Sequence, residues 1–272
     1  MFYKIYKNIL KPQKIPSKII KKMKFYYKKK KYDKSKFEKK QNEIFKNLKL
    51  DRNLGLEKLN NIKKQFNFLN DRPMSSEHEV LFSSISLINN FKIHKILEIG
   101  TFDGANSFLL SKLFPESKIH TIDLGSNDDD FINFYNRKES IKKFIDLRNQ
   151  NLSKNNLINF TEMNSLNLIN SKEKYDLIWI DGAHGYPVVC IDIINSLNLI
   201  SNNGFILCDD IYTELKYSDS DRMYNSTASY ETLNALNKQN LISLELIFKR
   251  LGSEHNCVEE ERQFVAIFKK IQ

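Results

Sequence analysis

The sequence predicts an α/β fold, a doubly wound sheet with mostly parallel strands and helices on both faces. From residue 92 onward, short apolar runs alternate with helical patterns. The runs are apolar throughout rather than at every second position, and each of the first five stops at a polar residue. Strand–helix alternation is typical of parallel sheets, and strands covered on both faces are apolar along their whole length. The chain of 272 residues is long enough for one such domain with an appendage.

The expected elements follow in order along the chain. Strands are expected at 93–99, 118–123, 158–163, 175–181, 204–209, 241–249 and 263–270. Helical patterns lie at 104–114, 137–153, 166–170, 187–200 and 228–239. The last two strands follow each other without a helix between them, which favours an antiparallel end to the sheet.

Residues 1–50 differ from the remainder of the chain in charge. They hold 18 lysines and three acidic residues, whereas residues 51–272 carry a net charge of −5. We expect a basic, Lys- and aromatic-rich arm in which residues 17–29 can form a short amphipathic helix. Such an arm is either simply solvated or contacts an anionic membrane surface or nucleic acid.

A helical lead-in is expected at 51–91, before a main domain at 92–272. Within it, Ser76 and Glu79 have the spacing of a capping box and precede the apolar positions Val80, Phe82 and Ile85. The three cysteines match no zinc or CxxC pattern, and lysines interrupt the N-terminal apolar residues. These features favour a reducing, cytoplasmic setting without a cleaved leader or a membrane span, with surface contact through the arm left open.

The ends of the predicted strands carry the residues suited to ligand binding. The first strand ends in "LEIGTFDG", in which Gly100 and Gly104 allow a tight turn into the following helix. Asp123 ends the second strand, where a carboxylate can bind both hydroxyls of a ribose. The acidic Glu98 before the first glycine would repel the diphosphate that GxGxxG loops bind, but it could hold an amine. We therefore expect a nucleoside cofactor at this edge of the sheet.

At these motifs the chain resembles the class I S-adenosylmethionine-dependent methyltransferases. "EIGTFDG" is similar to their first motif, and "IDGAHGY" with "NGFILCDD" is similar to a branch of small-molecule O-methyltransferases. That branch includes metal-dependent enzymes that act on catechols, caffeoyl-CoA and macrolide sugars. The resemblance covers about residues 75–272 and implies a Rossmann-like sheet of seven strands in the order 3-2-1-4-5-7-6, with the last strand antiparallel.

The resemblance also implies roles for single residues. It places S-adenosylmethionine against Glu98, Gly100, Thr101, Gly104, Asp123, Asn164, Ser165 and Asp181. It implies Mg²⁺ as a further cofactor, held by Asp181, Asp209 and Asp210, since Mg²⁺ prefers oxygen ligands. His184 would be the general base, with Asp181 as the second catalytic residue. The branch often has Asn where this chain has Asp210, a departure that concerns the metal rather than the nucleoside.

The expected function is S-adenosylmethionine-dependent transfer of a methyl group to a hydroxyl of a small molecule, a sugar or glycan precursor or a phenolic compound, with assistance from the metal. The chain lacks an (N/D)PP(Y/F) stretch, which argues against methylation of adenine or glutamine nitrogen. Two alternatives stay open: a module tethered to a membrane or nucleic acid through the arm, and another enzyme, such as a hydroxylase, on the same fold. A homo-oligomer is equally open.

Overall fold

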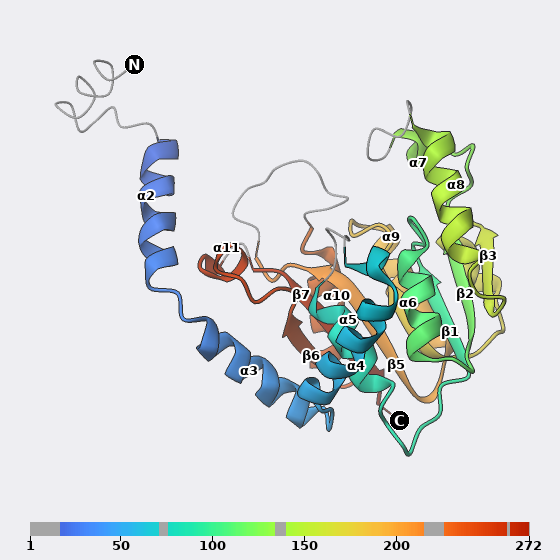
Figure 1. Ribbon diagram of the computed structural model, residues 1–272, viewed down its shortest axis with the longest axis horizontal. Helices are drawn as coiled ribbons and strands as arrows, with labels where there is room; N and C mark the ends of the chain where they lie inside the picture. Colours follow the sequence, from blue (N-terminus) through green and yellow to red (C-terminus); the bar gives the residue numbers. More distant parts are fainter. Residues whose placement is uncertain (1–16, 71–75, 134–139, 215–225, 260–261, 272) are drawn as a thin grey trace.

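The computed structural model describes residues 17–70, 76–133, 140–214, 226–259 and 262–271. Its centre is a seven-stranded sheet in the order β3-β2-β1-β4-β5-β7-β6 (Figure 1). The first five strands pair in parallel, and β7 is antiparallel to both β5 and β6. The predicted fold class, strand order and antiparallel strand are confirmed. The strands are β1 (Lys95–Ile99), β2 (Lys118–Asp123), β3 (Ile158–Glu162), β4 (Tyr175–Ile180), β5 (Ile200–Ile211), β6 (Ile242–Phe248) and β7 (Phe264–Lys270).

The helices that follow the strands agree with the predicted positions to within a few residues. They are α6 (Ala105–Leu113), α8 (Ile141–Leu152), the 3-10 helix η4 (Ser165–Asn170), α9 (Val188–Leu199) and α10 (Ala228–Lys238). Before the sheet lie α2 (Ser17–Lys30), α3 (Lys34–Asn47), α4 (Arg52–Gln65), η2 (Asn67–Leu69) and α5 (Glu77–Ile85). The sequence analysis missed α3 and two short helices, α7 (Asp129–Asn133) and α11 (Ser253–Asn256).

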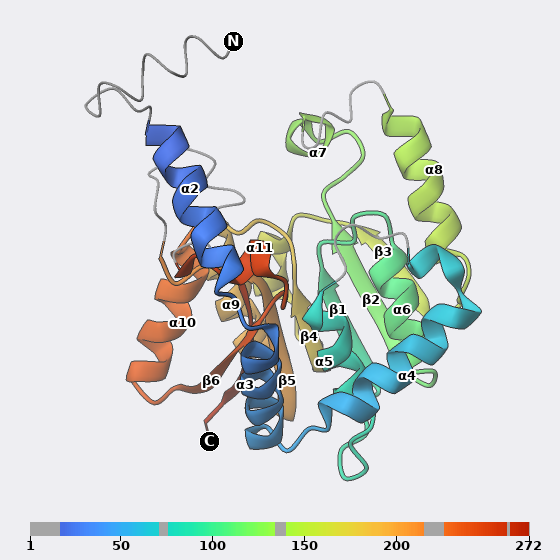
Figure 2. The same ribbon diagram turned by 60° about the vertical axis from the view of Figure 1, so that its left-hand side comes forward.

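Two hydrophobic cores lie on the two faces of the sheet. Along β4, Leu177 and Trp179 contribute to the core under α3, α4, α5 and α6, whereas Ile178 and Ile180 contribute to the core under α9 and α10. All four side chains are 0% exposed. Figure 2 shows the first group of helices in front of the sheet and α9 and α10 on its other side. Burial on both faces explains why this strand has no alternating polar positions.

Helix α3 lies within the segment predicted as a basic arm, but it packs against the sheet. Gln41 and Phe45 on α3 are both 0% exposed, and the Phe37 ring packs edge-on against Phe248 of β6. The Tyr32 hydroxyl donates to the carbonyl of Leu251 at 2.7 Å. The high lysine content hid this helix, because its lysines lie outside while a few apolar and amide side chains face the sheet. No described helix combines the length and the apolar character that crossing a membrane requires.

Polar contacts fix α3 and α5 to the edge strand β6. The Gln41 side chain donates to the Phe248 carbonyl at 3.1 Å and accepts from the Phe248 amide at 2.9 Å. Its Nε2 also donates to Glu77, which forms a two-point ion pair with Arg52 at 2.8 and 2.9 Å. Ser76 caps α5 as predicted, through the His78 amide, while the Glu79 carboxylate accepts from Lys63.

The contact between Gln41 and Phe248 can be tested by replacing the amide with an apolar group. Gln41→Leu leaves a buried N–H and a buried C=O of β6 without their partner, at about 1–3 kcal/mol for each group. We expect the free energy of unfolding to fall by about 2–4 kcal/mol in chemical denaturation.

The matched control is Lys39→Leu, an exposed position on the same helix. We expect it to change stability by less than about 0.5 kcal/mol. Equal stability of the two variants would mean that α3 is not fixed to the sheet in this way.

Candidate active site

A pocket opens at the carboxyl edge of the parallel strands. Its walls come from the residues that follow β1, β2, β3 and β4, from α7, and from the end of β5. The register explains this meeting, since Ile99 of β1 lies opposite both Ile122 of β2 and Ile180 of β4, and Ile180 lies opposite Cys208 of β5. Of the predicted site residues, the lining includes Glu98, Gly100, Thr101, Asp123, Asn164, Ser165, Asp181, His184 and Asp210.

The turn after β1 requires glycine where it passes the end of β4. Gly100 has a φ of +99°, and a Cβ built there would lie 2.2 Å from the carbonyl oxygen of Asp181. The second glycine of the motif, Gly104, has a φ of +73° and begins α6 against Leu152. Gly104 lies outside the pocket lining, so its role in this structure is to start the helix.

The Glu98 side chain stabilises this turn through hydrogen bonds. Its carboxylate is 0% exposed and accepts from Asn106 at 2.7 Å, from Thr121 at 2.6 Å and from Ser107. The Thr101 hydroxyl hydrogen-bonds that of Thr121 at 2.7 Å. The side chains of Glu98 and Thr101 therefore hold β1, β2 and the start of α6 together. The sequence analysis instead expected the Glu98 carboxylate to meet an amine of the ligand.

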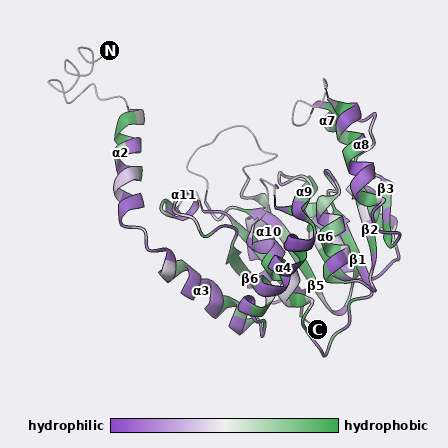
Figure 3. Ribbon diagram, viewed as in Figure 1, coloured by the Kyte–Doolittle hydropathy of each residue, from purple (hydrophilic) through white to green (hydrophobic). Residues whose placement is uncertain are grey.

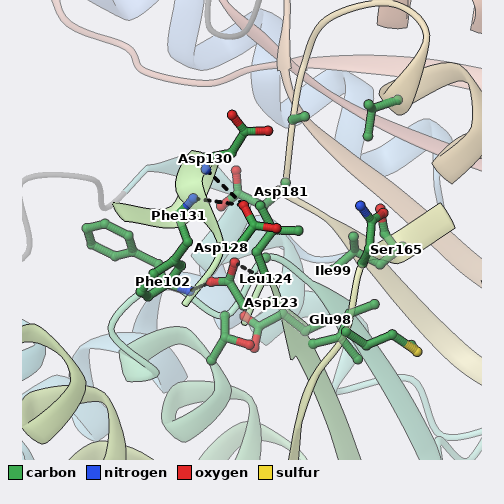
Figure 4. A pocket seen from close by; sticks show the side chains of 18 of the residues that line it. Glu98, Ile99, Phe102, Asp123, Leu124, Asp128, Asp130, Phe131, Ser165 and Asp181 are labelled. Atoms are coloured by element: carbon green, nitrogen blue, oxygen red, sulfur yellow. Dashed lines mark hydrogen bonds between the residues drawn. The ribbon is translucent and has the colours of Figure 1, made fainter. Parts of the chain in front are cut away.

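Asp123 is fixed at the edge of the pocket. One carboxylate oxygen accepts from the Phe102 amide at 2.9 Å and the other from the Leu124 amide at 2.8 Å. Figure 4 shows these contacts and the adjacent end of the pocket. A carboxylate accepts up to about four hydrogen bonds, so two backbone donors orient Asp123 without exhausting its capacity.

An apolar wall next to Asp123 was not predicted. Phe102, Leu124, Phe131 and Met163 line the pocket together with the predicted Asn164 and Ser165. Phe131 lies on α7, where its amide and that of Asp130 donate to the Asp128 carboxylate (Figure 4). The signal for α7 was present, because Asp128 is a helix-capping residue three positions before an aromatic one.

A buried lysine lies between two of the predicted metal ligands. The Lys249 ammonium is 2.7 Å from Asp209 Oδ2 and 2.5 Å from Asp210 Oδ1. Burial alone would raise the pKa of Asp209, but Lys249 outweighs it and lowers that pKa to about 2. Burial would likewise lower the pKa of Lys249, but Asp209, Asp210 and Asp181 raise it. At neutral pH the Asp209 carboxylate is therefore negatively charged and the Lys249 ammonium beside it is positively charged.

The predicted metal ligands Asp181, Asp209 and Asp210 do not form a cluster of metal-binding side chains among the described residues, so metal binding stays a prediction. Within the described ranges, no three His, Cys, Asp or Glu side chains come together in a way that could hold a metal ion. The Lys249 ammonium contacts both Asp209 and Asp210, and its single positive charge balances one of their two negative charges. Asp209 is 3% exposed and does not line the pocket.

His184 and Asp181 lie side by side at the pocket floor. His184 Nε2 is 3.6 Å from Asp181 Oδ1 and 3.6 Å from Asp210 Oδ2. Burial lowers the pKa of His184 below 6.5, against the opposing effect of Asp210 and Asp209. Burial, and then the carboxylates of Asp209 and Asp210, raise the pKa of Asp181 well above 3.8. A neutral imidazole beside carboxylates can accept a proton and then be stabilised as a cation.

Lys249 is a charged residue beside this pocket that the sequence analysis missed. It directly follows β6, and β6 runs parallel to β5 through their shared antiparallel neighbour β7. The rule that polar groups follow the strands into the site thus applies to the sixth strand as well. It was not applied there because the last two strands were regarded only as an antiparallel end.

Comparison with known proteins agrees with this geometry. Residues 97–211 match a protein family model described as a methyltransferase domain. No curated protein matches the chain. Among solved structures, a putative caffeoyl-CoA O-methyltransferase from Staphylococcus aureus is 18% identical, with 78% of this chain and 91% of that chain covered and a TM-score of 0.52.

Two further structures have lower TM-scores. An O-methyltransferase from Bacillus cereus, solved in complex with SAH, is 14% identical, with 79% of this chain and 91% of that chain covered and a TM-score of 0.49. The O-methyltransferase TomG from Streptomyces achromogenes, involved in tomaymycin synthesis and solved in complex with SAM, is 14% identical, with 66% and 74% covered and a TM-score of 0.45.

The matched segment begins within β1 and ends with β5. It therefore contains the glycine turn, Asp123, the pair Asp181 and His184, and Asp209–Asp210. Over residues 97–211 the chain is similar to a methyltransferase domain, and its seven-stranded sheet has the Rossmann-like fold of the S-adenosylmethionine-dependent methyltransferases.

Proposed function

We propose that this protein transfers a methyl group from S-adenosylmethionine to a hydroxyl oxygen of a small molecule, a sugar or a phenolic compound. The observation that carries the proposal is one pocket with an oriented carboxylate, Asp123, and a neutral imidazole, His184, on its walls. The likeness in fold to the putative caffeoyl-CoA O-methyltransferase from S. aureus supports the same reaction class.

The pocket residues fit the nucleoside part of this cofactor. Asp123 would accept from the ribose hydroxyls, and the apolar wall with Phe102, Phe131 and Met163 would cover the adenine next to Asn164 and Ser165. The backbone at Gly100, which passes close to the Asp181 carbonyl, would lie near the amino acid part. When bound, the cofactor supplies an electrophilic methyl group on a positively charged sulfur.

The proton of the acceptor is assigned to His184. A hydroxyl loses its proton poorly at neutral pH, so a base within reach speeds its attack on a methyl group. His184 Nε2 would accept this proton, and the resulting imidazolium would lie between Asp181 and Asp210. Because the carboxylate set does not fit a metal ion, we assign no part of the reaction to one.

We further propose that α2 attaches the protein to an anionic membrane surface. Its apolar side chains Ile19, Ile20, Met23, Tyr26 and Tyr27 are 43–67% exposed. In a helix of 3.6 residues per turn, these five positions fall within an arc of about 120°. The helix also carries the exposed lysines Lys22, Lys24, Lys28, Lys29 and Lys30.

The placement of α2 supports a membrane rather than a nucleic acid as its partner. Figures 1 and 2 both show α2 projecting beyond the sheet, and Figure 3 shows hydrophilic and hydrophobic residues mixed along it. An apolar stripe flanked by lysines fits the headgroup region of an anionic bilayer. Residues 51–272, with a net charge of −5, would add no basic surface for nucleic acid.

Replacing Asp123 tests the cofactor site. Asp123→Asn removes the negative charge while the side chain keeps its shape, and hydrogen bonds to a charged group contribute about 1.5–3 kcal/mol. We expect the Kd for S-adenosylmethionine, measured by isothermal titration calorimetry, to rise at least about tenfold. Asp146→Asn, at an exposed position on α8, removes the same charge away from the pocket and should leave the Kd unchanged. Equal affinities would argue against the ribose assignment.

The pH profile tests the role of His184. Because burial lowers its pKa, the basic form dominates at pH 7, and the rate should fall as pH drops through a midpoint below 6.5. His184→Gln should reduce kcat by about 10²–10⁴-fold and remove this acid limb. His120→Gln, at a half-buried histidine on β2 outside the pocket lining, is the control. A His184→Gln protein with wild-type kcat, or with the acid limb intact, would refute the assignment.

Vesicle sedimentation of the full chain tests the membrane proposal. We expect binding to vesicles that contain phosphatidylserine, weaker binding at high salt, and little binding to phosphatidylcholine alone. Ile20→Ser with Met23→Ser should weaken binding at least about tenfold. Leu54→Ser, at a 54% exposed position on α4, is the control. Binding to RNA duplexes but not to vesicles would assign α2 to nucleic acid instead.

A further inference from the structure

We propose that the Lys249 ammonium is a built-in cation of this active site, which takes the place of a divalent metal ion and makes methyl transfer metal-independent. The inference rests on the proposed methyl transfer for its effect on rate. Its structural part, that the Asp209–Asp210 pair does not bind a metal ion, stands on the charges and contacts of the site alone.

The geometry leaves no room for a second cation at this pair. Lys249 is 2% exposed, and its ammonium contacts one oxygen of Asp209 and one of Asp210, at 2.7 and 2.5 Å. A divalent ion would either compete with Lys249 for these two oxygens or bind Asp209 Oδ1 and Asp210 Oδ2 next to its positive charge. In a partly desolvated site, repulsion between two cations at such a separation exceeds what two shared carboxylates return.

Lys249 is held in place through its backbone as well as its side chain. Its amide donates to the Gln263 carbonyl at 2.9 Å, which continues the pairing of β6 with β7. Its carbonyl accepts from the Glu77 amide at the start of α5, also at 2.9 Å. A lysine fixed at both backbone groups differs from a surface lysine that could swing away to admit a metal ion.

Lys249 acts on the reaction through Asp210. It does not line the pocket, whereas Asp210 does. Lys249 and Gln263 both donate to Asp210 Oδ1, and the second oxygen, Oδ2, lies 3.6 Å from His184 Nε2. Lys249 is therefore a positioning residue, because it fixes the carboxylate that faces the proposed base.

The ammonium also sets the charge of the cluster. Asp181, Asp209 and Asp210 without a cation would repel one another, and Lys249 cancels one of their charges. The remaining negative charge still favours an imidazolium at His184. A divalent ion in the same place would cancel two of the three negative charges instead of one, and would therefore favour a proton on the imidazole less. The built-in cation thus suits catalysis by a general base rather than by a metal.

Metal binding and metal dependence test the proposal together. Using Mn²⁺ alone as the probe, electron paramagnetic resonance should detect no site on the wild-type protein, and EDTA should leave kcat unchanged. Lys249→Met keeps the side-chain length but removes the charge. We expect this variant to gain one Mn²⁺ site, to lose at least about tenfold in kcat, and to recover part of that loss with Mg²⁺ or Mn²⁺.

Two further variants are controls for effects on folding. Lys63→Met removes another largely buried lysine, paired with Glu79 at 2.6 Å, and should change neither Mn²⁺ binding nor kcat. Lys249→Arg retains the charge and should bind no Mn²⁺, so it remains informative if Lys249→Met does not fold. A wild-type protein that binds Mn²⁺ at this pair, or that loses turnover in EDTA and regains it with Mg²⁺, would overturn the proposal.

The outcomes also separate this inference from the proposed function. If no hydroxylated acceptor is methylated but the Mn²⁺ results are as expected, the built-in cation stands and the O-methyl transfer fails. If methyl transfer occurs but Lys249→Met gains no Mn²⁺ site and keeps the wild-type kcat, the proposed function stands and Lys249 has only a structural role.

Discussion

The parallel pairing of β2, β1, β4 and β5 is the constraint on which the pocket depends. Because Ile122, Ile99, Ile180 and Cys208 share one level of the sheet, the residues that follow them leave the core together. The largely apolar strands are thereby linked to a polar edge. A shift of one residue in any pair would turn buried side chains to the opposite face and displace this edge.

Much of this arrangement could be predicted from the sequence, for physical reasons. The strand order and the pocket edge follow from local patterns, because burial on both faces leaves runs such as Leu177–Ile180. The partners of single side chains do not follow from such patterns. Glu98 lines the pocket as expected, but its hydrogen bonds to α6 were not predicted. Lys249 was counted as a strand residue, because its contacts with Asp209 and Asp210 join segments about 40 residues apart.

Local sequence patterns also do not show which side chains of the N-terminal segment are buried. Lysines dominate α3, so composition grouped it with α2, although Phe45 and Gln41 lie inside the fold. Net charge describes which partners a segment attracts, whereas burial is decided by the few side chains that face the core. Two neighbouring helices of similar composition thus have different surroundings, one exposed along its length and the other packed on the sheet.

The two hydrogen bonds between Gln41 and Phe248 have a consequence for assembly. β6 is one of the two edge strands of the sheet, and an uncovered edge strand offers its backbone groups to any other extended chain. At Phe248 the amide of Gln41 occupies both of these groups, as a neighbouring strand would. Sheet extension by a second molecule is therefore blocked at this point, and an intermolecular β-ladder that includes Phe248 would first have to displace α3.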